Sequence, residues 1–339
     1  MHLNENQINK ILLIKPRGIG DIVLSTIVLK NLKAHFPAAE IHYLVEDFAE
    51  DAVRYHPLVY KVLTMGKSEF VLNVIKRIRK EKYDLLLDLY SNPRTAQITF
   101  FSGAKIRTGY SYKGRKYAYN VFATAERGKV HSAEHNLELL NALNIPVITK
   151  EINYYCSEKA IAKAKDYFHK LKNEGELVTG IIPSGGWESK RCEAEKWIEI
   201  IQEFRSKFKS KFLILWGPGD ENDTKYINNK LPDITTVAPP TSVDELAALI
   251  GLCDMVIAND SGPMHIAAAL KVPTLGLFGP TDPKKHGPYS TNSAYVIKDA
   301  LHCIVCNKLV CPYNHECMTE LPVDEIIAKS ESLLSEKIK

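Results

Sequence analysis

The chain lacks any run of about 18 apolar residues, the length that an α-helix needs to cross a bilayer. Its first ten residues, Met1 to Lys10, are polar and lack the apolar core of a secretory signal. We therefore expect a protein that stays in the cytoplasm. With 339 residues, 45% of them hydrophobic and 25% charged, the composition is that of a soluble globular protein with room for two domains.

A disulfide framework is not expected, although the chain has seven Cys. Four of them are crowded into Cys303-x2-Cys306-x4-Cys311-x5-Cys317, with His302 and His315 close by. In a cytosolic chain this crowding does not imply disulfides, and the spacing matches no single zinc pattern. Two alternatives stay open: a reduced, metal-free cluster, which we favour, and a structural metal knuckle.

Acidic residues are scarce in the first half of the chain. Residues 1–155 hold 22 Lys and Arg against 15 Asp and Glu, a net +7, whereas residues 156–339 hold 22 against 25, a net −3. Residues 105–117 carry five cations and no acid. This stretch suits a phosphorylated sugar or nucleic acid as partner, and an ordinary solvated loop is the alternative.

Apolar strand patterns alternate with amphipathic helix patterns along both halves, which predicts parallel, doubly wound sheets. We predict domains at 1–155 and 156–322, both Rossmann-like, with a cleft outside the carboxyl ends of their strands. The last helix, within 323–339, is amphipathic and is expected to pack back on one domain, the first included. Predicted strands are 11–14, 41–45, 62–63, 85–89, 178–182, 212–216, 255–258 and 274–278, and predicted helices are 22–35, 70–82, 158–175, 195–208, 242–252, 263–270 and 323–337.

The first strand is followed by a polar turn that half-matches the dinucleotide fingerprint. Gly18 and Gly20 are in place, but the third position is Val23, and no clear acid ends the second strand. A nicotinamide-dependent oxidoreductase is therefore only an alternative. Asp21 lies at the start of the following helix, where the helix dipole favours its ionised form. It suits either a general base or a helix cap.

Three turns in the second half also follow predicted strands, and each suits a nucleotide ligand. Asp260 to His265 combine a Ser cap, a Gly and a Pro at a helix start, which is an anion site suited to a diphosphate. An acid after the strand at 212–216, Asp220 or Glu221, suits ribose hydroxyls. The remaining turn offers small residues and a cation for a phosphate: Ser184, Gly185, Gly186 and Lys190.

These motifs together resemble glycosyltransferase family 9, the heptosyltransferases of lipopolysaccharide core synthesis. The resemblance covers nearly the whole chain and rests on the segments 11–21, 183–191, 260–265 and 278–281, with a late Cys-rich stretch at 303–318. It departs at the second turn, where Cys192-Glu193 stand in place of the family's Trp-Pro. Arg17 stands where close relatives often have a small residue, which suggests a different acceptor.

The resemblance implies a GT-B fold and an inverting transfer that needs no metal and no cofactor. It implies a donor such as ADP-heptose in the second domain and an anionic, lipid-linked saccharide acceptor in the first, with peripheral contact to the inner membrane face and no nucleic acid. Asp21 is then the general base. The expected donor-binding residues are Ser184, Gly185, Gly186, Lys190, Glu221, Asp260, Ser261, Gly262 and His265. The expected acceptor-binding residues are Arg17, Arg107, Lys113, Arg115 and Lys116.

Overall fold

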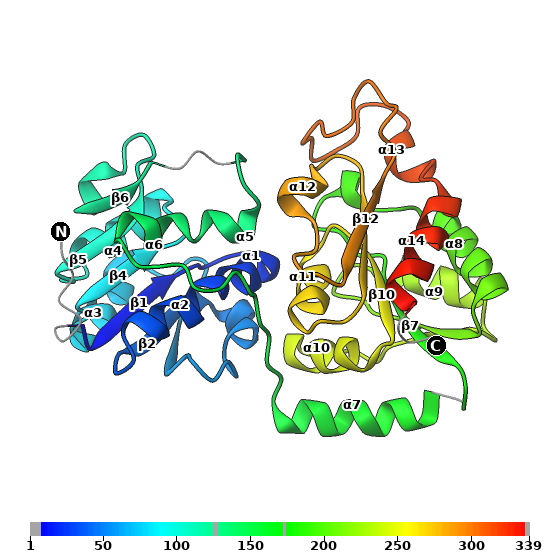
Figure 1. Ribbon diagram of the computed structural model, residues 1–339, viewed down its shortest axis with the longest axis horizontal. Coiled ribbons are helices and arrows are strands. Elements are labelled where there is room, and N and C mark those ends of the chain that lie inside the picture. The colour runs from blue at the N-terminus through cyan, green and yellow to red at the C-terminus, as the bar shows by residue number, and fades with distance from the viewer. Residues whose placement is uncertain (1–7, 125–127, 172–173, 336–339) are drawn as a thin grey trace. The chain divides into compact units, whose positions relative to one another are not determined.

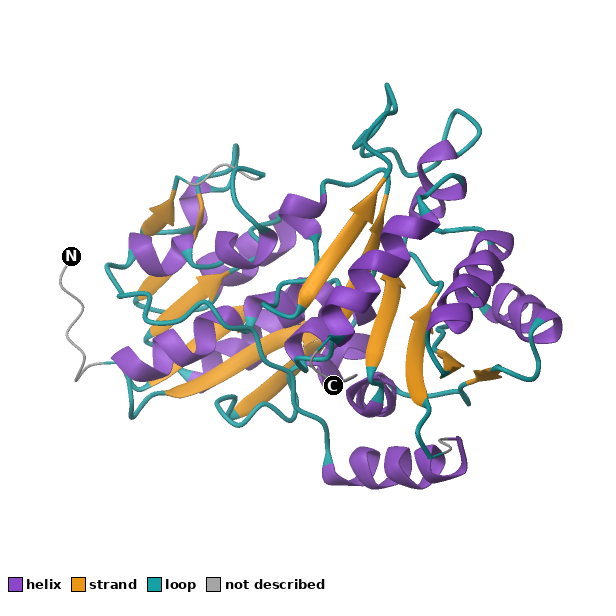
Figure 2. Ribbon diagram, turned by 45° about the vertical axis from the view of Figure 1, so that its right-hand side comes forward, coloured by secondary structure: helices purple, strands orange, loops and turns teal. Residues whose placement is uncertain are grey.

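The computed structural model describes residues 8–124, 128–171 and 174–335 and divides into two compact units, Met1–Tyr155 and Cys156–Lys339. Figure 1 shows their helices and strands, and Figure 2 shows the strands of each sheet lying side by side with helices packed against them. In the described part of the chain each unit holds one six-stranded sheet. The α/β fold class predicted from the alternation is confirmed.

The two sheets have the same topology. Their strand orders are β3-β2-β1-β4-β5-β6 and β12-β11-β10-β7-β8-β9, and every neighbouring pair of strands is parallel. In the first sheet, β1, β2 and β3 follow one another towards one edge, and β4, β5 and β6 follow one another towards the other. The second sheet is built in the same way from β7–β9 and β10–β12. The direction in which strands are added therefore reverses between β1 and β4, and again between β7 and β10. Ligands of open α/β sheets bind outside the carboxyl ends of the strands at this reversal. The topology therefore marks one candidate ligand edge in each unit.

The elements of the first unit are β1 (Lys10–Ile14), α1 (Ile19–Ser25), α2 (Ile27–His35), β2 (Glu40–Glu46), η2 (Asp47–Ala52), β3 (Lys61–Met65), α3 (Val71–Glu81), β4 (Leu85–Asp88), α4 (Pro93–Phe101), β5 (Ile106–Tyr110), η3 (Lys116–Ala118), β6 (Val121–Ala123), α5 (Ser132–His135) and α6 (Glu138–Ala142). Those of the second are α7 (Glu158–Leu171), β7 (Leu177–Ile182), η4 (Glu188–Lys190), α8 (Ala194–Lys207), β8 (Ser210–Ile214), α9 (Glu221–Lys230), β9 (Thr235–Val237), α10 (Val243–Leu252), β10 (Met255–Asn259), α11 (Gly262–Ala269), β11 (Thr274–Phe278), α12 (Pro283–His286), β12 (Ser293–Ile297), α13 (Glu316–Thr319) and α14 (Val323–Leu334).

The helix predicted over 22–35 is two helices. α1 begins at Ile19, earlier than expected, and Thr26 separates it from α2. The hydroxyls of Ser25 and Thr26 donate to the carbonyls of Ile22 and Val23, three residues back. Such bonds compete with the helical ladder, which explains why the ladder is interrupted here.

Several short elements escaped the pattern analysis. β5, β6, β9 and β12 each have partly exposed positions, so they lack the continuous apolar run that marks a buried strand. α4 begins with a capping box in which the side chain of Asn92 accepts from the Thr95 N–H. Its start signal is present in the sequence, but its apolar periodicity is weak. The predicted ends of helices 158–175 and 323–337 extend into residues outside the described ranges.

The last helix belongs to the second unit. Ile326, Ile327 and Leu334 of α14 are buried in one apolar cluster with Trp197 and Phe204 of α8. The option that this helix packs on the first unit is therefore wrong, and the second unit extends beyond residue 322. α14 contacts α8, β12 and β11, all of its own unit. Within the described ranges no helix combines the length and hydropathy required for a membrane span.

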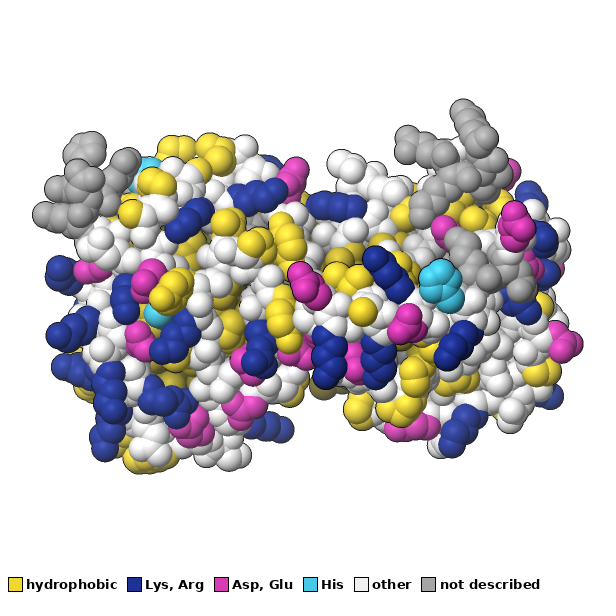
Figure 3. All heavy atoms as spheres, turned by 90° about the horizontal axis from the view of Figure 1, so that it is seen from below, with side chains coloured by type: hydrophobic (Ala, Val, Ile, Leu, Met, Phe, Trp, Pro, Cys, Tyr) yellow, Lys and Arg dark blue, Asp and Glu magenta, His cyan; other side chains and the backbone are white. Residues whose placement is uncertain are grey.

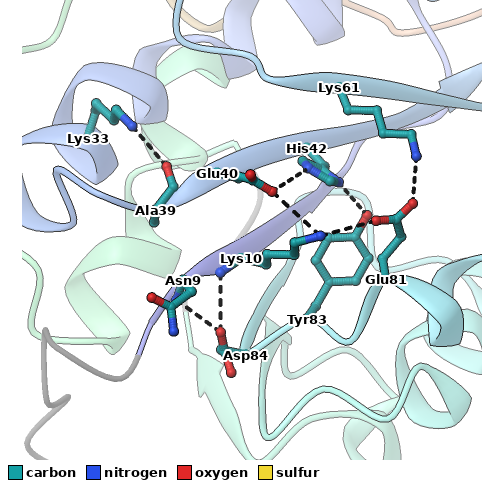
Figure 4. A network of polar contacts seen from close by, with 10 residues as sticks. All are labelled: Asn9, Lys10, Lys33, Ala39, Glu40, His42, Lys61, Glu81, Tyr83 and Asp84. Atoms are coloured by element: carbon teal, nitrogen blue, oxygen red, sulfur yellow. Dashed lines mark hydrogen bonds and ion pairs between the residues drawn. The ribbon is translucent and has the colours of Figure 1, made fainter.

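The amino ends of β1 to β3 are joined by a polar network (Figure 4). The ammonium of Lys10 lies 3.4 Å from Glu81 Oε2 and 3.5 Å from Glu40 Oε2. His42 is buried, and its Nδ1 shares a hydrogen bond with the Tyr83 hydroxyl at 2.8 Å. Burial lowers the pKa of His42. These contacts bind the strands at the edge opposite the ligand edge, so they support the fold of the unit.

Candidate functional site

At the ligand edge of the first unit, Asp21 lies over Gly18. Gly18 has φ 78° and is the N-cap of α1, and a Cβ placed on it would lie 2.7 Å from Asp21 Oδ2. Only a glycine therefore allows the carboxylate to occupy this position. Asp21 is exposed, and the helix has no side-chain cap hydrogen bond. Its carboxylate is therefore accessible to a ligand, and it lies in the first turn of α1.

Arg17 reaches from the same turn to the end of β2. Its Nε lies 2.5 Å from Glu46 Oε1, and its side chain is 45% exposed while that of Glu46 is 4% exposed. Hydrogen bonding with Glu46 raises the pKa of Arg17. In a dinucleotide site an acid at the end of this strand would bind ribose hydroxyls. Here Glu46, which ends the strand, is buried against Arg17, which further weakens the oxidoreductase alternative.

Asp88, at the end of β4, is a structural carboxylate that the sequence analysis did not single out. It is fully buried, its Oδ2 accepts from the Tyr119 hydroxyl at 2.8 Å, and its Oδ1 accepts from the Ser91 N–H at 2.8 Å. Burial raises its pKa, and the hydrogen bonds oppose that rise. Tyr119 packs on Gly109, where an added Cβ would lie 2.4 Å from the ring. The sequence did contain a signal for this role, namely an acidic residue inside the apolar run at 85–89.

The basic stretch 105–117 is dispersed over several elements. Lys113 and Lys116 are exposed and Arg115 is partly exposed, around the turn that follows β5. Arg107 lies in the first half of β5, opposite Leu86, and donates to the carbonyls of Ala104 and Ala118. Its guanidinium braces the backbone at the amino half of the sheet. The structure therefore does not bring Arg107 together with Arg17.

In the second unit, the turn after β7 and the turn after β10 meet. The two strands are neighbours, with Ala258 opposite Ile182. Lys190 Nζ lies 2.7 Å from Asp260 Oδ2, and their side chains are only 15% and 7% exposed. The Thr281 hydroxyl donates to the same carboxylate oxygen at 2.6 Å. The ammonium is also 4.3 Å from the centre of the Trp187 ring, so it is held in place from two sides.

The helix that begins beside this pair is α11. Ser261 is its N-cap residue, Gly262 is its first residue, and no side-chain cap hydrogen bond is present. The Ser261 hydroxyl is buried and has no hydrogen-bond partner among the described residues. His265, one turn into the helix, is 7% exposed. A helix N-terminus with an adjacent ammonium is an environment that stabilises a diphosphate.

The acids after β8 have different surroundings. Asp220 is 5% exposed, its Oδ2 accepts from the Gly217 N–H at 3.1 Å, and its Oδ1 lies 3.3 Å from Arg191 Nη2. Burial raises its pKa. Glu221 is partly exposed and accepts from the Gly219 N–H at 2.9 Å. Asp220 thus shapes the turn, and Glu221 is the more accessible of the two.

The small residues of the turn after β7 leave room beside Lys190. Gly186 is exposed and has nothing within 4 Å of an added Cβ, while Gly185 is buried and its carbonyl accepts from Arg191 Nε at 3.0 Å. Ser184 is partly exposed. A cavity of about 520 Å³ opens next to this turn, and it is lined by Glu188, Arg191, Glu193, Glu195, Tyr226 and His315 among others. Its acidic lining does not suit phosphates, which leaves Lys190 and the start of α11 as the candidate diphosphate site.

The four cysteines of the Cys-rich segment lie close enough for Cys303, Cys306 and Cys311 to act electrostatically on Cys317. All seven cysteines are free thiols, and no group of three or more His, Cys, Asp or Glu within the described ranges is placed to hold a metal ion. Burial raises the pKa of Cys317 to about 12. The sulfur of Cys317 instead packs on Gly279, where an added Cβ would lie 2.7 Å from it. The metal-free cluster and the metal knuckle both stay predictions.

Two Rossmann-like units, each with a candidate ligand edge at the reversal of its strand order, are the architecture of the GT-B fold. The family model of glycosyltransferase family 9 (heptosyltransferase) matches residues 71–316. The chain belongs to this family, as the sequence resemblance predicted.

Known proteins are similar over almost the full length. Lipooligosaccharide heptosyltransferase 2 of Campylobacter jejuni is 24% identical over 96% of this chain and 98% of its own. The crystal structure of a family 9 glycosyltransferase from Veillonella parvula superposes with a TM-score of 0.88 at 22% identity, covering 99% of both chains. The E. coli heptosyltransferase WaaC with ADP-2-deoxy-2-fluoro heptose gives 0.70 at 18% identity, covering 95% of this chain and 99% of that one.

Proposed function

We propose that this enzyme transfers a heptose from ADP-heptose to an anionic, lipid-linked sugar of the lipopolysaccharide core, with inversion at the anomeric carbon. Lys190 carries the proposal, because Asp260 holds its ammonium beside the helix N–H groups at the start of α11. The names of the relatives support the sugar and its destination, and the WaaC complex supports ADP as the nucleotide.

The proposed chemistry begins at Asp21. Its carboxylate accepts the proton of an acceptor hydroxyl while that oxygen attacks C1 of the donor sugar. A single displacement of this kind inverts the configuration at C1. The bond from C1 to the diphosphate oxygen breaks, and the electron pair leaves with ADP. Because Asp21 belongs to the first unit and Lys190 to the second, transfer needs residues from both.

The departing diphosphate gains negative charge, and it needs a counter-charge at that moment. Lys190, the N–H groups at the start of α11 and the Ser261 hydroxyl are the groups that we assign to this role. His265 and Glu221 then bind the sugar and the ribose. These protein groups would fulfil the electrostatic role without a metal ion. Preorganised donors of this kind contribute on the order of 3 kcal/mol each to lowering a barrier.

The acceptor is assigned to the first unit. Arg17 lies at the same edge as Asp21, and Lys113, Arg115 and Lys116 follow the end of β5. Their charge suits phosphates on a lipid-linked saccharide. Arg107 is left out of this set, since its guanidinium braces the backbone.

Asp21→Asn tests the reaction. The substitution keeps the shape of the side chain and removes its basicity, so we expect transfer from ADP-heptose to fall by at least about 100-fold. Thermal stabilisation by ADP should be unchanged, because Asp21 lies in the other unit. Full activity in this variant would exclude Asp21 as the base. Thermal shifts with a panel of nucleotide sugars test the donor: stabilisation by UDP- or GDP-sugars alone would contradict ADP-heptose.

A further inference from the structure

The Cys-rich segment, residues 303–318, belongs to the long connection between β12 and α13. It forms the loop at the top of the second unit in Figure 1 and runs into α13. No step of the proposed transfer uses it. Its hydrogen bonds nevertheless reach the turn that carries Lys190 and the turn that supports Asp260. A segment with contacts to both turns can set the position of this ion pair.

Ser189, the residue before Lys190, is held by the segment through three hydrogen bonds. Its N–H donates to the Leu309 carbonyl at 3.2 Å, and its hydroxyl donates to the Lys308 carbonyl at 2.6 Å. Its carbonyl lies 2.8 Å from His315 Nε2. A carbonyl oxygen only accepts, so Nε2 is the nitrogen that carries a proton and donates. Ser189 is 2% exposed, so these three bonds replace contacts with water.

The segment also holds the turn that follows β11. Two of its backbone N–H groups donate to carbonyls of this turn: Val305 to Gly279 at 3.1 Å and Asn307 to Pro280 at 2.8 Å. The next residue, Thr281, donates to Asp260 Oδ2, the oxygen that lies 2.7 Å from the Lys190 ammonium. The segment thus reaches the ion pair from both sides, through Ser189 to the lysine and through Thr281 to the carboxylate.

Side chains of the segment pack closely on both turns. A Cβ placed on Gly279 would lie 2.7 Å from Cys317 Sγ and 2.8 Å from Met318 Sδ, which is too close for a Cβ atom. The thiol of Cys192, two residues after Lys190, donates to the Met318 carbonyl at 3.5 Å. Cys192, Cys317 and Met318 are all buried. The segment therefore has little room to shift relative to either turn.

η4 has too few internal bonds to fix Lys190 by itself. It is a single 3₁₀ turn, Glu188–Lys190, and its N-cap residue Trp187 makes no side-chain cap hydrogen bond. Such turns are short because their hydrogen-bond geometry is poor. The two residues before Trp187 are glycines, and nothing lies within 4 Å of a Cβ added to Gly186. The position of the turn therefore depends on bonds from outside it, and those of Ser189 come from the Cys-rich segment.

We propose that the Cys-rich segment positions the Lys190 ammonium for the departing diphosphate, with His315 as the positioning residue that acts through the Ser189 carbonyl. The proposal rests on the proposed function, in which this ammonium balances the charge of the leaving ADP. A Lys side chain is long and flexible, so its charge acts at one point only where its surroundings fix it. Asp260 and Trp187 orient the ammonium, and the segment fixes the backbone from which the side chain starts.

His315→Ala and His315→Gln separate positioning from folding. His315 has φ 64°, so both variants carry the same backbone cost, but only Gln restores an N–H donor near the place of Nε2. We expect His315→Ala to weaken ADP binding and to lower kcat, each by roughly five- to tenfold, while KM for the acceptor stays that of the parent. His315→Gln should return ADP affinity and kcat to within about twofold of the parent. Isothermal titration with ADP and transfer kinetics well below the melting temperature measure these values.

Ser189→Ala is the second variant, in case His315→Ala does not fold. It removes only the hydroxyl that donates to Lys308 and keeps the carbonyl that His315 binds. We expect it to weaken ADP binding by roughly threefold or more, again with KM for the acceptor unchanged.

Two controls remove a comparable contact elsewhere in the second unit. His302→Ala removes an imidazole just before the segment, which packs edge-on against Tyr313 with ring centres 5.1 Å apart. Lys163→Ala removes a 2.8 Å ion pair with Glu245 from α7, the helix at the bottom of the unit in Figure 1. Figure 3 shows the face that α7 covers, where Lys and Arg side chains are mixed with Asp and Glu. Both controls should bind ADP and transfer as the parent does.

Three results would overturn the proposal. The first is parental ADP affinity and kcat in His315→Ala, or in Ser189→Ala if the former does not fold. The second is a loss in His315→Ala that Gln does not restore, because it would arise from the backbone and not from the hydrogen bond. The third is an equal loss in His302→Ala. A parent enzyme that does not bind ADP would refute the proposed function as well, whereas normal transfer by the parent with any of these three results would refute only the positioning role.

Discussion

Replacing Lys190 by Met separates its role in binding from its role in the fold. The change keeps the aliphatic stem and removes the ammonium that lies 2.7 Å from Asp260 Oδ2. Asp260 then remains as a carboxylate that is 7% exposed and accepts a hydrogen bond from Thr281. A hydrogen bond between charged groups contributes about 1.5–3 kcal/mol, so the variant should lose about that much stability. For a unit of this size the melting temperature should fall by roughly 3–12 °C.

The same substitution should weaken ADP binding by roughly 10- to 150-fold, because one charge-assisted contact with the diphosphate is lost. The double variant Lys190→Met with Asp260→Asn removes both charges, so no buried carboxylate is left without its cation. It should recover most of the melting temperature without recovering ADP binding. Calorimetric unfolding and isothermal titration with ADP measure the two quantities, and Lys207→Met is the control for loss of an exposed charge.

Two results would refute this reasoning. Unchanged ADP affinity in Lys190→Met would show that the ammonium does not contact the diphosphate. A double variant as unstable as the single one would show that the loss of stability arises from the lost contact with Trp187 and not from an unpaired charge. The centre of the Trp187 ring lies 4.3 Å from the ammonium.

Two further substitutions test the first unit. Gly18→Ala should lower the free energy of unfolding by roughly 1–2 kcal/mol and reduce turnover by about tenfold or more, because the added Cβ displaces the Asp21 carboxylate. The control is Gly114→Ala, since Gly114 has a similar φ of 77° but nothing within 4 Å of an added Cβ, so its activity should be normal. Equal activities in the two variants would refute the clash. Burial lowers the pKa of His56 from 6.5 to about 4. Between these two pH values the unfolded chain binds a proton at His56 and the folded chain does not. Stability should therefore fall by up to about 3 kcal/mol as pH drops from 6.5 to 4, and His56→Asn should lack this loss in urea unfolding at several pH values, whereas an unchanged pH profile would contradict it.

Much of the fold could be predicted because parallel strands that are buried on both faces produce apolar runs, and these runs alternate with helical periodicity. β1, β4, β7 and β10 are fully or almost fully buried, and each was predicted close to its observed bounds. Edge strands such as β6 and β9 were missed, since a partly exposed strand carries no such run. The break between α1 and α2 at Thr26 was missed because it depends on which backbone carbonyls accept hydrogen bonds from the Ser25 and Thr26 hydroxyls.

The motifs at the strand ends could likewise be read from the sequence, because a helix start, a glycine turn and a cation are local features. Asp21, Lys190 and the Asp260 turn all lie at the ends of strands beside a reversal of winding. The combination of these turns also predicted the family, which the match over residues 71–316 confirms.

Pairings between distant segments were decided only by the tertiary structure. Asp260 meets Lys190 across 70 positions because β7 and β10 are neighbours, and Glu46 is buried against Arg17 because β1 pairs with β2. Arg107 was assigned to the acceptor by its charge, but strand register placed it in the amino half of β5. Charge and spacing specify what a side chain can bind, whereas the order and register of the strands determine which partner it reaches.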